Sequence, residues 1–105
     1  MSSLEKNIYI SNLFNFYKNL LTEKQQDIFY SYYYNDIGLT EISKEKNISR
    51  QAVLDSIKKT ETLLLDYEKK LKLYEIYLNQ TKIVEDINKT QNLKKLNEII
   101  KLWEE

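Results

Sequence analysis

The chain of 105 residues has no cysteine, no histidine and no proline, and its single glycine is Gly38. Without Cys and His, it cannot form disulfide scaffolds, zinc sites built on those residues, thiol nucleophiles or His-based triads. The scarcity of turn formers argues against a β protein, which needs Gly and Pro for its turns. We therefore expect an all-α protein that holds no metal or cofactor and is not an enzyme.

A dominant charge is also missing, because 16 basic residues balance 16 acidic ones. A neutral chain gives no long-range reason for strong attraction to nucleic acid or anionic lipid. Apolar runs are much shorter than the roughly 20 residues that span a membrane. The first ten residues lack the basic end and apolar stretch of a signal peptide. We expect a cytoplasmic protein without membrane insertion.

Apolar residues recur at helical spacing in the first third of the chain. They predict an amphipathic helix over residues 4–21, and Thr22 with Gln25 fits a capping box that begins a second helix, running to about Tyr34. The aromatic cluster at 29–34 has two interpretations, a stacking platform for single-stranded bases or part of the core. We favour the core for the residues that share one side of the helix: Ile28, Phe29 and Tyr32.

The segment 35–38 is the clearest turn, because Asn and Asp satisfy the backbone locally and Gly38 tolerates a positive φ. After it, Thr40 can cap a short helix over residues 41–46. Asn47 belongs to a residue type that adopts the left-handed conformation closing a helix. Two helices are thus expected to meet through a turn of about three residues.

Residues 39–60 contain every part of a helix-turn-helix. Such a motif needs a short helix, a tight turn, and a second helix with one side on the first helix and the other free for the DNA major groove. Ser43 is small where the helices approach, and Ser49 suits the N-cap of the second helix. The expected inner contacts are made by Ile42, Ile48, Val53 and Ile57.

The outward residues at the start of this second helix suit a reader of DNA bases. Arg can bond bidentately to guanine and Gln to adenine, which assigns base contacts to Arg50 and Gln51. The alternative is that Arg50 is only a solvent-exposed residue at the start of the helix. Every other basic residue is Lys, however, and Lys lacks the planar guanidinium group that can bond bidentately. The residues expected to hold phosphate are Lys46, Ser49, Lys58 and Lys59.

From Ser49 no stop signal is evident until 79–81, and from Ile57 onward the apolar spacing alternates between four and three, as in a coiled-coil seam. A further helix is expected over residues 82–103. We expect a helix-turn-helix domain over residues 1–65 and a helical extension over 66–105 that forms a homodimer. Packing of the same residues within one chain is the alternative. The predicted dimer interface comprises Leu64, Tyr67, Leu71, Tyr74 and Leu78.

The sequence LTEKQ at 21–25 and the sequence SRQAV at 49–53 resemble the YlxM-like family of small helix-turn-helix proteins. The similarity extends from Leu13 through Leu71. It implies a fold similar to region four of bacterial sigma factors, with a recognition helix beginning at Arg50. It also implies a link to the signal recognition particle, the ribonucleoprotein that delivers nascent membrane proteins.

Two functions remain open at this point. The first is a DNA-binding regulatory protein, dimeric and associated with the signal recognition particle pathway. The second is an interaction module that uses the same fold to bind the protein or the RNA of that particle without reading a DNA sequence. The neutral net charge favours the second, whereas Arg50 and Gln51 favour the first.

Overall fold

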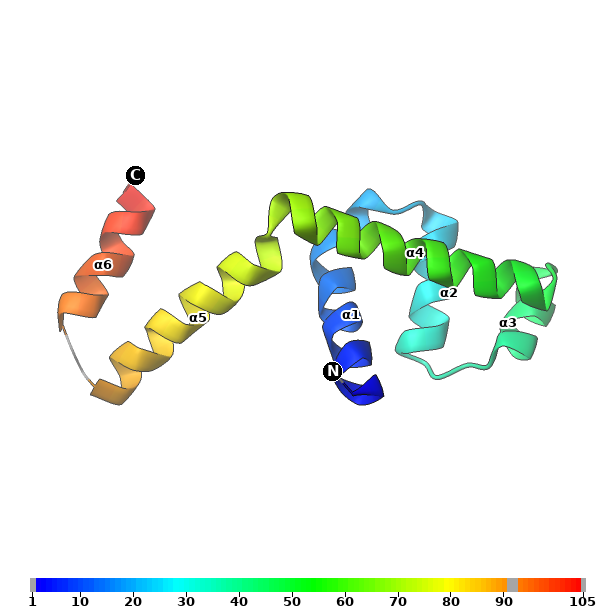
Figure 1. Cartoon of the computed structure of the whole chain (residues 1–105), viewed down its shortest axis with the longest axis horizontal. Coiled ribbons are helices and arrows are strands. Elements are labelled where there is room, and N and C mark those ends of the chain that lie inside the picture. Colours follow the sequence, from blue (N-terminus) through cyan, green and yellow to red (C-terminus); the bar gives the residue numbers. More distant parts are fainter. Residues whose placement is uncertain (1, 91–92, 105) are drawn as a thin grey trace. The chain divides into compact units, whose positions relative to one another are not determined.

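The computed structural model describes residues 2–90 and 93–104, and within these ranges it contains helices and no strand (Figure 1). The expected all-α class is confirmed. Contacts divide the chain into a first unit, residues 1–72, and a second unit, residues 73–105. The elements are α1 (Ser3–Tyr17), the 3-10 turn η1 (Lys18–Leu20), α2 (Glu23–Tyr33), α3 (Leu39–Lys46), α4 (Arg50–Leu71), α5 (Leu73–Thr90) and α6 (Leu93–Glu104).

Helix α4 is the centre of the first unit, because α1, α2 and α3 all pack against it (Figure 1). An aromatic stack adds to this core: the ring of Phe29 lies 4.7 Å from that of Phe14 and 4.3 Å from that of Tyr33, centroid to centroid. Large rings let a small domain bury much apolar area. The buried residues are Ile10, Leu13, Phe14, Tyr17, Leu21, Ile28, Phe29, Ile42, Val53, Ile57, Thr60 and Leu64.

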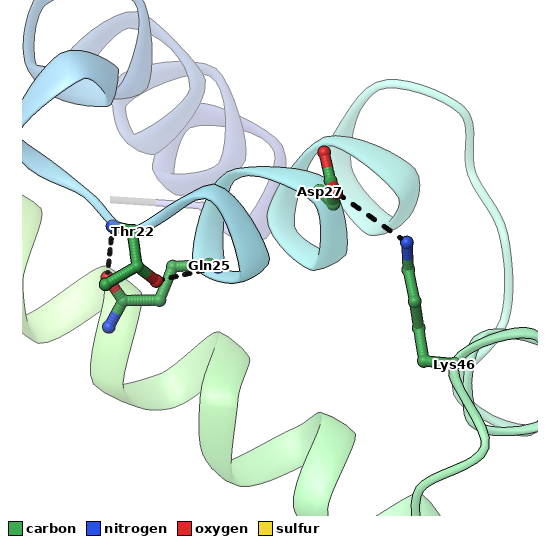
Figure 2. Close-up of polar contacts among 4 residues, drawn as sticks. All are labelled: Thr22, Gln25, Asp27 and Lys46. Atoms are coloured by element: carbon green, nitrogen blue, oxygen red, sulfur yellow. Dashed lines mark hydrogen bonds and ion pairs between the residues drawn. The ribbon is translucent and has the colours of Figure 1, made fainter.

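Helix α2 begins with the predicted capping box, which is confirmed (Figure 2). The Gln25 backbone N–H donates to Thr22 Oγ1 at 3.1 Å, and the Thr22 N–H donates to Gln25 Oε1 at 3.0 Å. These bonds satisfy two N–H groups that a helix start leaves without partners. The preceding helix α1 ends at Tyr17, and η1 leads from it to this cap.

The turn between α2 and α3 lies where it was expected, but two details of the prediction were wrong. Asp36, with φ 53°, takes the left-handed conformation, while Gly38 has φ −70°. Gly38 is the N-cap of α3, so Thr40 lies inside the first turn instead of capping it. The physical reason is that Asp also tolerates the left-handed region and Gly is an acceptable N-cap.

Of the aromatic residues assigned to the core, Phe29 is buried together with Ile28, but Tyr32 is 38% exposed. Tyr33 packs against the core in its place. Tyr30 and Tyr34, both exposed, stack on each other with their ring centroids 5.0 Å apart. Spacing along α2 identified the buried side of the helix but misassigned its edge by one residue.

The prediction of an uninterrupted helix from Ser49 to 79–81 was wrong. Helix α4 ends at Leu71, and Lys72 adopts a left-handed φ of 56° while its N–H donates to the Glu68 carbonyl at 2.9 Å. Such a cap satisfies a terminal carbonyl but costs about 1–2 kcal/mol for a residue other than Gly. The expected helix over 82–103 is replaced by α5 and α6.

The second unit consists of α5 and α6, which pack against each other. Among its residues with described side chains, 73–88 and 98–103, none is buried. The first unit therefore has its own core, whereas the described part of the second unit leaves its apolar side chains in contact with solvent. In the part of the chain that the structure describes, no helix is long and apolar enough to cross a membrane.

Candidate nucleic-acid interface

Helices α3 and α4 meet through a tight turn that is held by local hydrogen bonds. Asn47 adopts the left-handed conformation, with φ 56°, and its N–H reaches the Ser43 and Lys44 carbonyls. The Ile48 N–H donates to the Ser43 carbonyl at 3.1 Å, and the Ala52 N–H donates to Ser49 Oγ at 3.0 Å. Two predictions are confirmed: Asn47 ends α3 as a C-cap in the left-handed conformation, and Ser49 is the N-cap of α4.

The four residues predicted as inner contacts of the motif come together. Ile42, Val53 and Ile57 are buried with Ile28 in one cluster, and Ile48 is partly buried against it. The first helix of the motif is therefore fixed to one side of α4 by burial of branched apolar side chains. The opposite side of α4 remains available at its first three turns.

The structure leaves most of the predicted nucleic-acid contacts exposed. Ser49, Arg50 and Gln51 are exposed at the start of α4, and Lys58 and Lys59 are exposed two turns later. On one helix these positions lie within roughly 15 Å of each other along the axis, at 1.5 Å per residue. They form a surface that we call the α4 face: Ser49, Arg50, Gln51, Asp55, Lys58 and Lys59.

One acidic residue interrupts the α4 face. Gln51 Nε2 donates a hydrogen bond to Asp55 Oδ1 at 2.8 Å. This bond holds the amide that was predicted to read a base, and the carboxylate places a negative charge where phosphates would approach. Binding through Gln51 therefore requires the amide to exchange Asp55 for a base edge.

Lys46, the remaining predicted phosphate contact, points toward α2. Its Nζ lies 3.8 Å from Asp27 Oδ2, and its side chain is 28% exposed (Figure 2). This ion pair ties α3 to α2 through a partly exposed contact of modest strength. Lys46 is thus partly neutralised, whereas Lys58 and Lys59 have no ion pair within 4 Å in the described part of the chain.

The structure adds Lys24, which the sequence reasoning missed. A groove of about 440 Å³ runs between the start of α2 and α4, and both Lys24 and Lys59 line it together with Asp55. Lys24 lies 35 positions before Lys59 in the sequence, so only the packing of α2 on α4 brings the two cations to one groove. The only local signal for Lys24 in the sequence was its position in the first turn of α2, directly after the Thr22 cap.

Two glutamates of α4 bind tyrosines of the preceding helices. Tyr17 Oη donates to Glu68 at 2.6 Å, and Tyr33 Oη donates to Glu61. Burial raises the pKa of the Tyr33 phenol, and Glu61 raises it further by accepting the hydrogen bond and by its charge. Burial likewise raises the pKa of Tyr34, although its bond to Asn15 acts in the opposite direction. These contacts fix α1 and α2 on α4.

The five residues of the predicted dimer interface do not lie on one helix. Leu64 is fully buried within its own chain, and the Tyr67 ring lies 5.9 Å from that of Tyr17, centroid to centroid. Leu71 is exposed at the end of α4, while Tyr74 and Leu78 belong to α5. Self-association through these residues stays a prediction, and Leu64 already contributes to the core of the first unit.

Comparison with known proteins places the chain among related sequences. The model of a family described as "Putative helix-turn-helix protein, YlxM / p13 like" (UPF0122) matches residues 4–103. The UPF0122 protein YofM of Lactococcus lactis is 42% identical over 107 residues, which cover 97% of this chain and 96% of the relative. The chain belongs to the UPF0122 family. The family resemblance expected from the sequence is thereby confirmed.

Other members of the UPF0122 family share most of this length. A UPF0122 protein of Streptococcus gordonii is 46% identical over 84 residues, 80% of this chain and 76% of the relative. One of Fusobacterium nucleatum is 40% identical over 97 residues, 92% and 94% of the two chains. In this UPF0122 chain, α3 and α4 form the helix-turn-helix of the family description.

Proposed function

We propose that this protein binds DNA through the α4 face and acts as a regulatory factor without enzymatic activity. The observation that carries the proposal is the exposure of Arg50 and Gln51 in the first turn of a helix that is capped by Ser49 and fixed on its other side. Base-reading side chains of a helix-turn-helix act from this position, because the start of the recognition helix reaches deepest into the major groove.

Each residue of the surface has a distinct role in this proposal. Arg50 supplies a bidentate contact to guanine, and Gln51, released from Asp55, contacts adenine. Phosphate is held by Ser49, Lys58 and Lys59, with Lys24 on the groove side and Lys46 once it leaves Asp27. The four lysine contacts to phosphate give a salt slope of only about −4. One copy of the protein therefore binds weakly, and a two-fold dimer doubles the contacts.

The first experiment is selection from a random DNA duplex library, followed by binding measurements with variants. Arg50→Ala and Gln51→Ala are expected to weaken the selected site by about 1–3 kcal/mol each and to relax its sequence at separate positions. Lys69→Ala is the matched control, because it also removes one exposed positive charge from α4 but lies outside the α4 face. Unchanged binding by folded Arg50→Ala and Gln51→Ala proteins would rule out the base-reading role.

Asp55→Asn provides a gain-of-binding test on the same surface. It removes the only acidic side chain of the α4 face, and Gln51 then has an uncharged amide beside it in place of a carboxylate. We expect tighter binding to any duplex, with the same sequence preference, because the change adds attraction to phosphate without altering base contacts. Weaker binding would mean that the Gln51–Asp55 bond holds Gln51 in its binding position.

A second candidate is a contact with the RNA or the protein of the signal recognition particle, the link that the family resemblance implies. The balanced net charge and the carboxylate of Asp55 within the α4 face favour a contact with the protein of that particle over general DNA binding, because they weaken attraction to any phosphate backbone. Affinity capture with the full chain separates the two functions. Recovery of the particle's RNA or protein, with binding insensitive to Arg50→Ala, supports this candidate, and recovery of genomic DNA supports the first.

A further inference from the structure

Tyr30 and Tyr34 form an exposed pair of parallel rings that the α4 face does not use. The two residues are four positions apart, which puts them on the same side of α2, and Tyr34 is the C-cap of that helix. Their ring centroids are 5.0 Å apart and the ring planes differ by 15°. Tyr30 is 49% exposed and Tyr34 is 40% exposed. We call this pair the tyrosine platform.

The tyrosine platform is fixed to the core of the first unit. Tyr34 Oη lies within hydrogen-bond distance of the Ser11 carbonyl, at 3.0 Å, and of Asn15 Oδ1, at 2.8 Å. The Tyr34 ring also lies 5.9 Å, centroid to centroid, from that of Phe14, which is buried. Because these contacts already order the rings, a ligand that stacks on them costs little conformational freedom of the protein.

A groove of about 520 Å³ lies beside the tyrosine platform, and this volume is in the range of roughly 300–1,000 Å³ that holds small ligands. The amides of Asn15 and Gln26 line it. Asn15 uses its Oδ1 for Tyr34, and Gln26 uses its Nε2 for the Leu21 carbonyl at 3.1 Å. Among the described residues, Asn15 Nδ2 and Gln26 Oε1 make no hydrogen bond, so a donor and an acceptor remain available next to the rings.

The charged residues that line this groove balance each other. They are Lys18 and Lys46 on one side of the count and Asp27 and Glu45 on the other, and Lys46 Nζ lies 3.8 Å from Asp27 Oδ2 (Figure 2). A balanced lining gives no strong attraction to a polyanion or a polycation, so recognition falls to the rings and the amides. A nucleobase matches both, because it has a flat π-face and carries hydrogen-bond donors and acceptors on its edge.

We propose that the tyrosine platform binds an unpaired nucleobase, which stacks on the Tyr30 ring and is hydrogen-bonded at its edge by Asn15 and Gln26. The base belongs to a single-stranded nucleic acid or to a free nucleotide, because both present the same ring. Lys18, which is exposed, supplies one contact to phosphate. A single strand bound here therefore has a salt slope of about −0.7, against about −4 for the α4 face. The proposal does not rest on duplex binding by the α4 face.

The test titrates the isotope-labelled full chain with three probes and follows binding by NMR: AMP, a trinucleotide of deoxyadenosine, and the same trinucleotide backbone without bases. We expect the two probes with bases to shift the amide signals around Tyr30 and Tyr34. Stacking on an aromatic ring contributes roughly five- to 150-fold per base, so Tyr30→Leu is expected to weaken binding at least roughly fivefold, whereas Tyr30→Phe retains it. Tyr77→Leu is the matched control, because Tyr77 is equally exposed (50%) but lies on α5.

The source of the base follows from the affinities of the two probes that carry bases. Tighter binding of the trinucleotide identifies a single-stranded nucleic acid, and equal binding of AMP identifies a free nucleotide. Four results would overturn the proposal: no binding of either probe, equal binding of the probe without bases, unchanged binding by folded Tyr30→Leu, or loss of binding in Tyr30→Phe. Duplex binding is measured in parallel, since Tyr30→Leu is expected to leave it unchanged and Arg50→Ala to leave trinucleotide binding unchanged. Failure of one site is thereby distinguished from failure of the other.

Discussion

Thr60 offers a direct test of how the first unit is packed. It is fully buried on the side of α4 that also carries Ile57 and Leu64, and its Oγ1 has no hydrogen-bond partner within the described residues. A buried hydroxyl without a partner loses its bonds to water and gains nothing in return. We therefore expect that replacing Thr60 with Val, which has the same shape without the hydroxyl, stabilises the protein.

The magnitude follows from the cost of an unpartnered polar group. That cost is about 1–3 kcal/mol, so a gain of about 1 kcal/mol in the free energy of unfolding is a conservative expectation for Thr60→Val. For a domain of this size, such a gain corresponds to a rise in Tm of roughly 4–8 °C, or about 1 M in the urea midpoint. Far-UV circular dichroism during thermal and urea unfolding measures both.

Thr60→Ser is the control for this experiment. It keeps the hydroxyl and removes a buried methyl group, so it is expected to destabilise the protein by about 1 kcal/mol. If Thr60→Val is less stable than the unchanged protein while the slope of the urea transition stays the same, the hydroxyl has a partner in solution. The reasoning from burial would then be refuted.

Three further predictions concern single contacts. Tyr33→Phe removes the bond to Glu61 and is expected to cost about 1–2 kcal/mol near neutral pH. Because the fold raises the pKa of this phenol, its contribution is present below the unfolded pKa of about 10 and is lost as the pH rises above that value, so urea midpoints of the two proteins should converge there. Lys72→Gly is expected to gain about 0.5–1 kcal/mol by relieving the left-handed φ, while Lys72→Ala gains nothing in the same thermal assay. Asn47→Gly should unfold at the same temperature as the parent, whereas Asn47→Ala should lose about 1 kcal/mol.

Features set by neighbouring residues could be predicted from the sequence. The capping box needs only Thr22 and Gln25 at a spacing of three, and the turn of the helix-turn-helix needs only Asn47 and Ser49. These signals concern hydrogen bonds within one turn of the chain, so no tertiary contact is required to recognise them. The helix-turn-helix followed from such local rules together with the apolar spacing that buries Ile42 and Val53.

Features set by distant contacts could not be predicted in this way. The break after Leu71 is a separate case: it is local, but it falls at Lys72, a residue type with no preference for the left-handed region, so no sequence pattern marks it. The seam from Ile57 to Leu78 looked continuous because periodicity reports which side of a helix is apolar and not which element covers it. Leu64 fits a dimer seam as well as a core, and its spacing alone could not show that it is fully buried within its own chain.

The same limit applies to the candidate site. Sequence spacing placed Arg50 and Gln51 on the exposed start of α4, and it also puts Asp55 four positions after Gln51, where the two side chains can meet. It could not show that Asp27 binds Lys46 or that Lys24 shares a groove with Lys59. Each of these contacts adds or removes charge next to the base-reading residues. The nucleic-acid binding that we propose would therefore depend partly on the packing of α2 and α3 around α4, and Asp55→Asn tests the separate effect of the carboxylate within α4 with one atom exchanged.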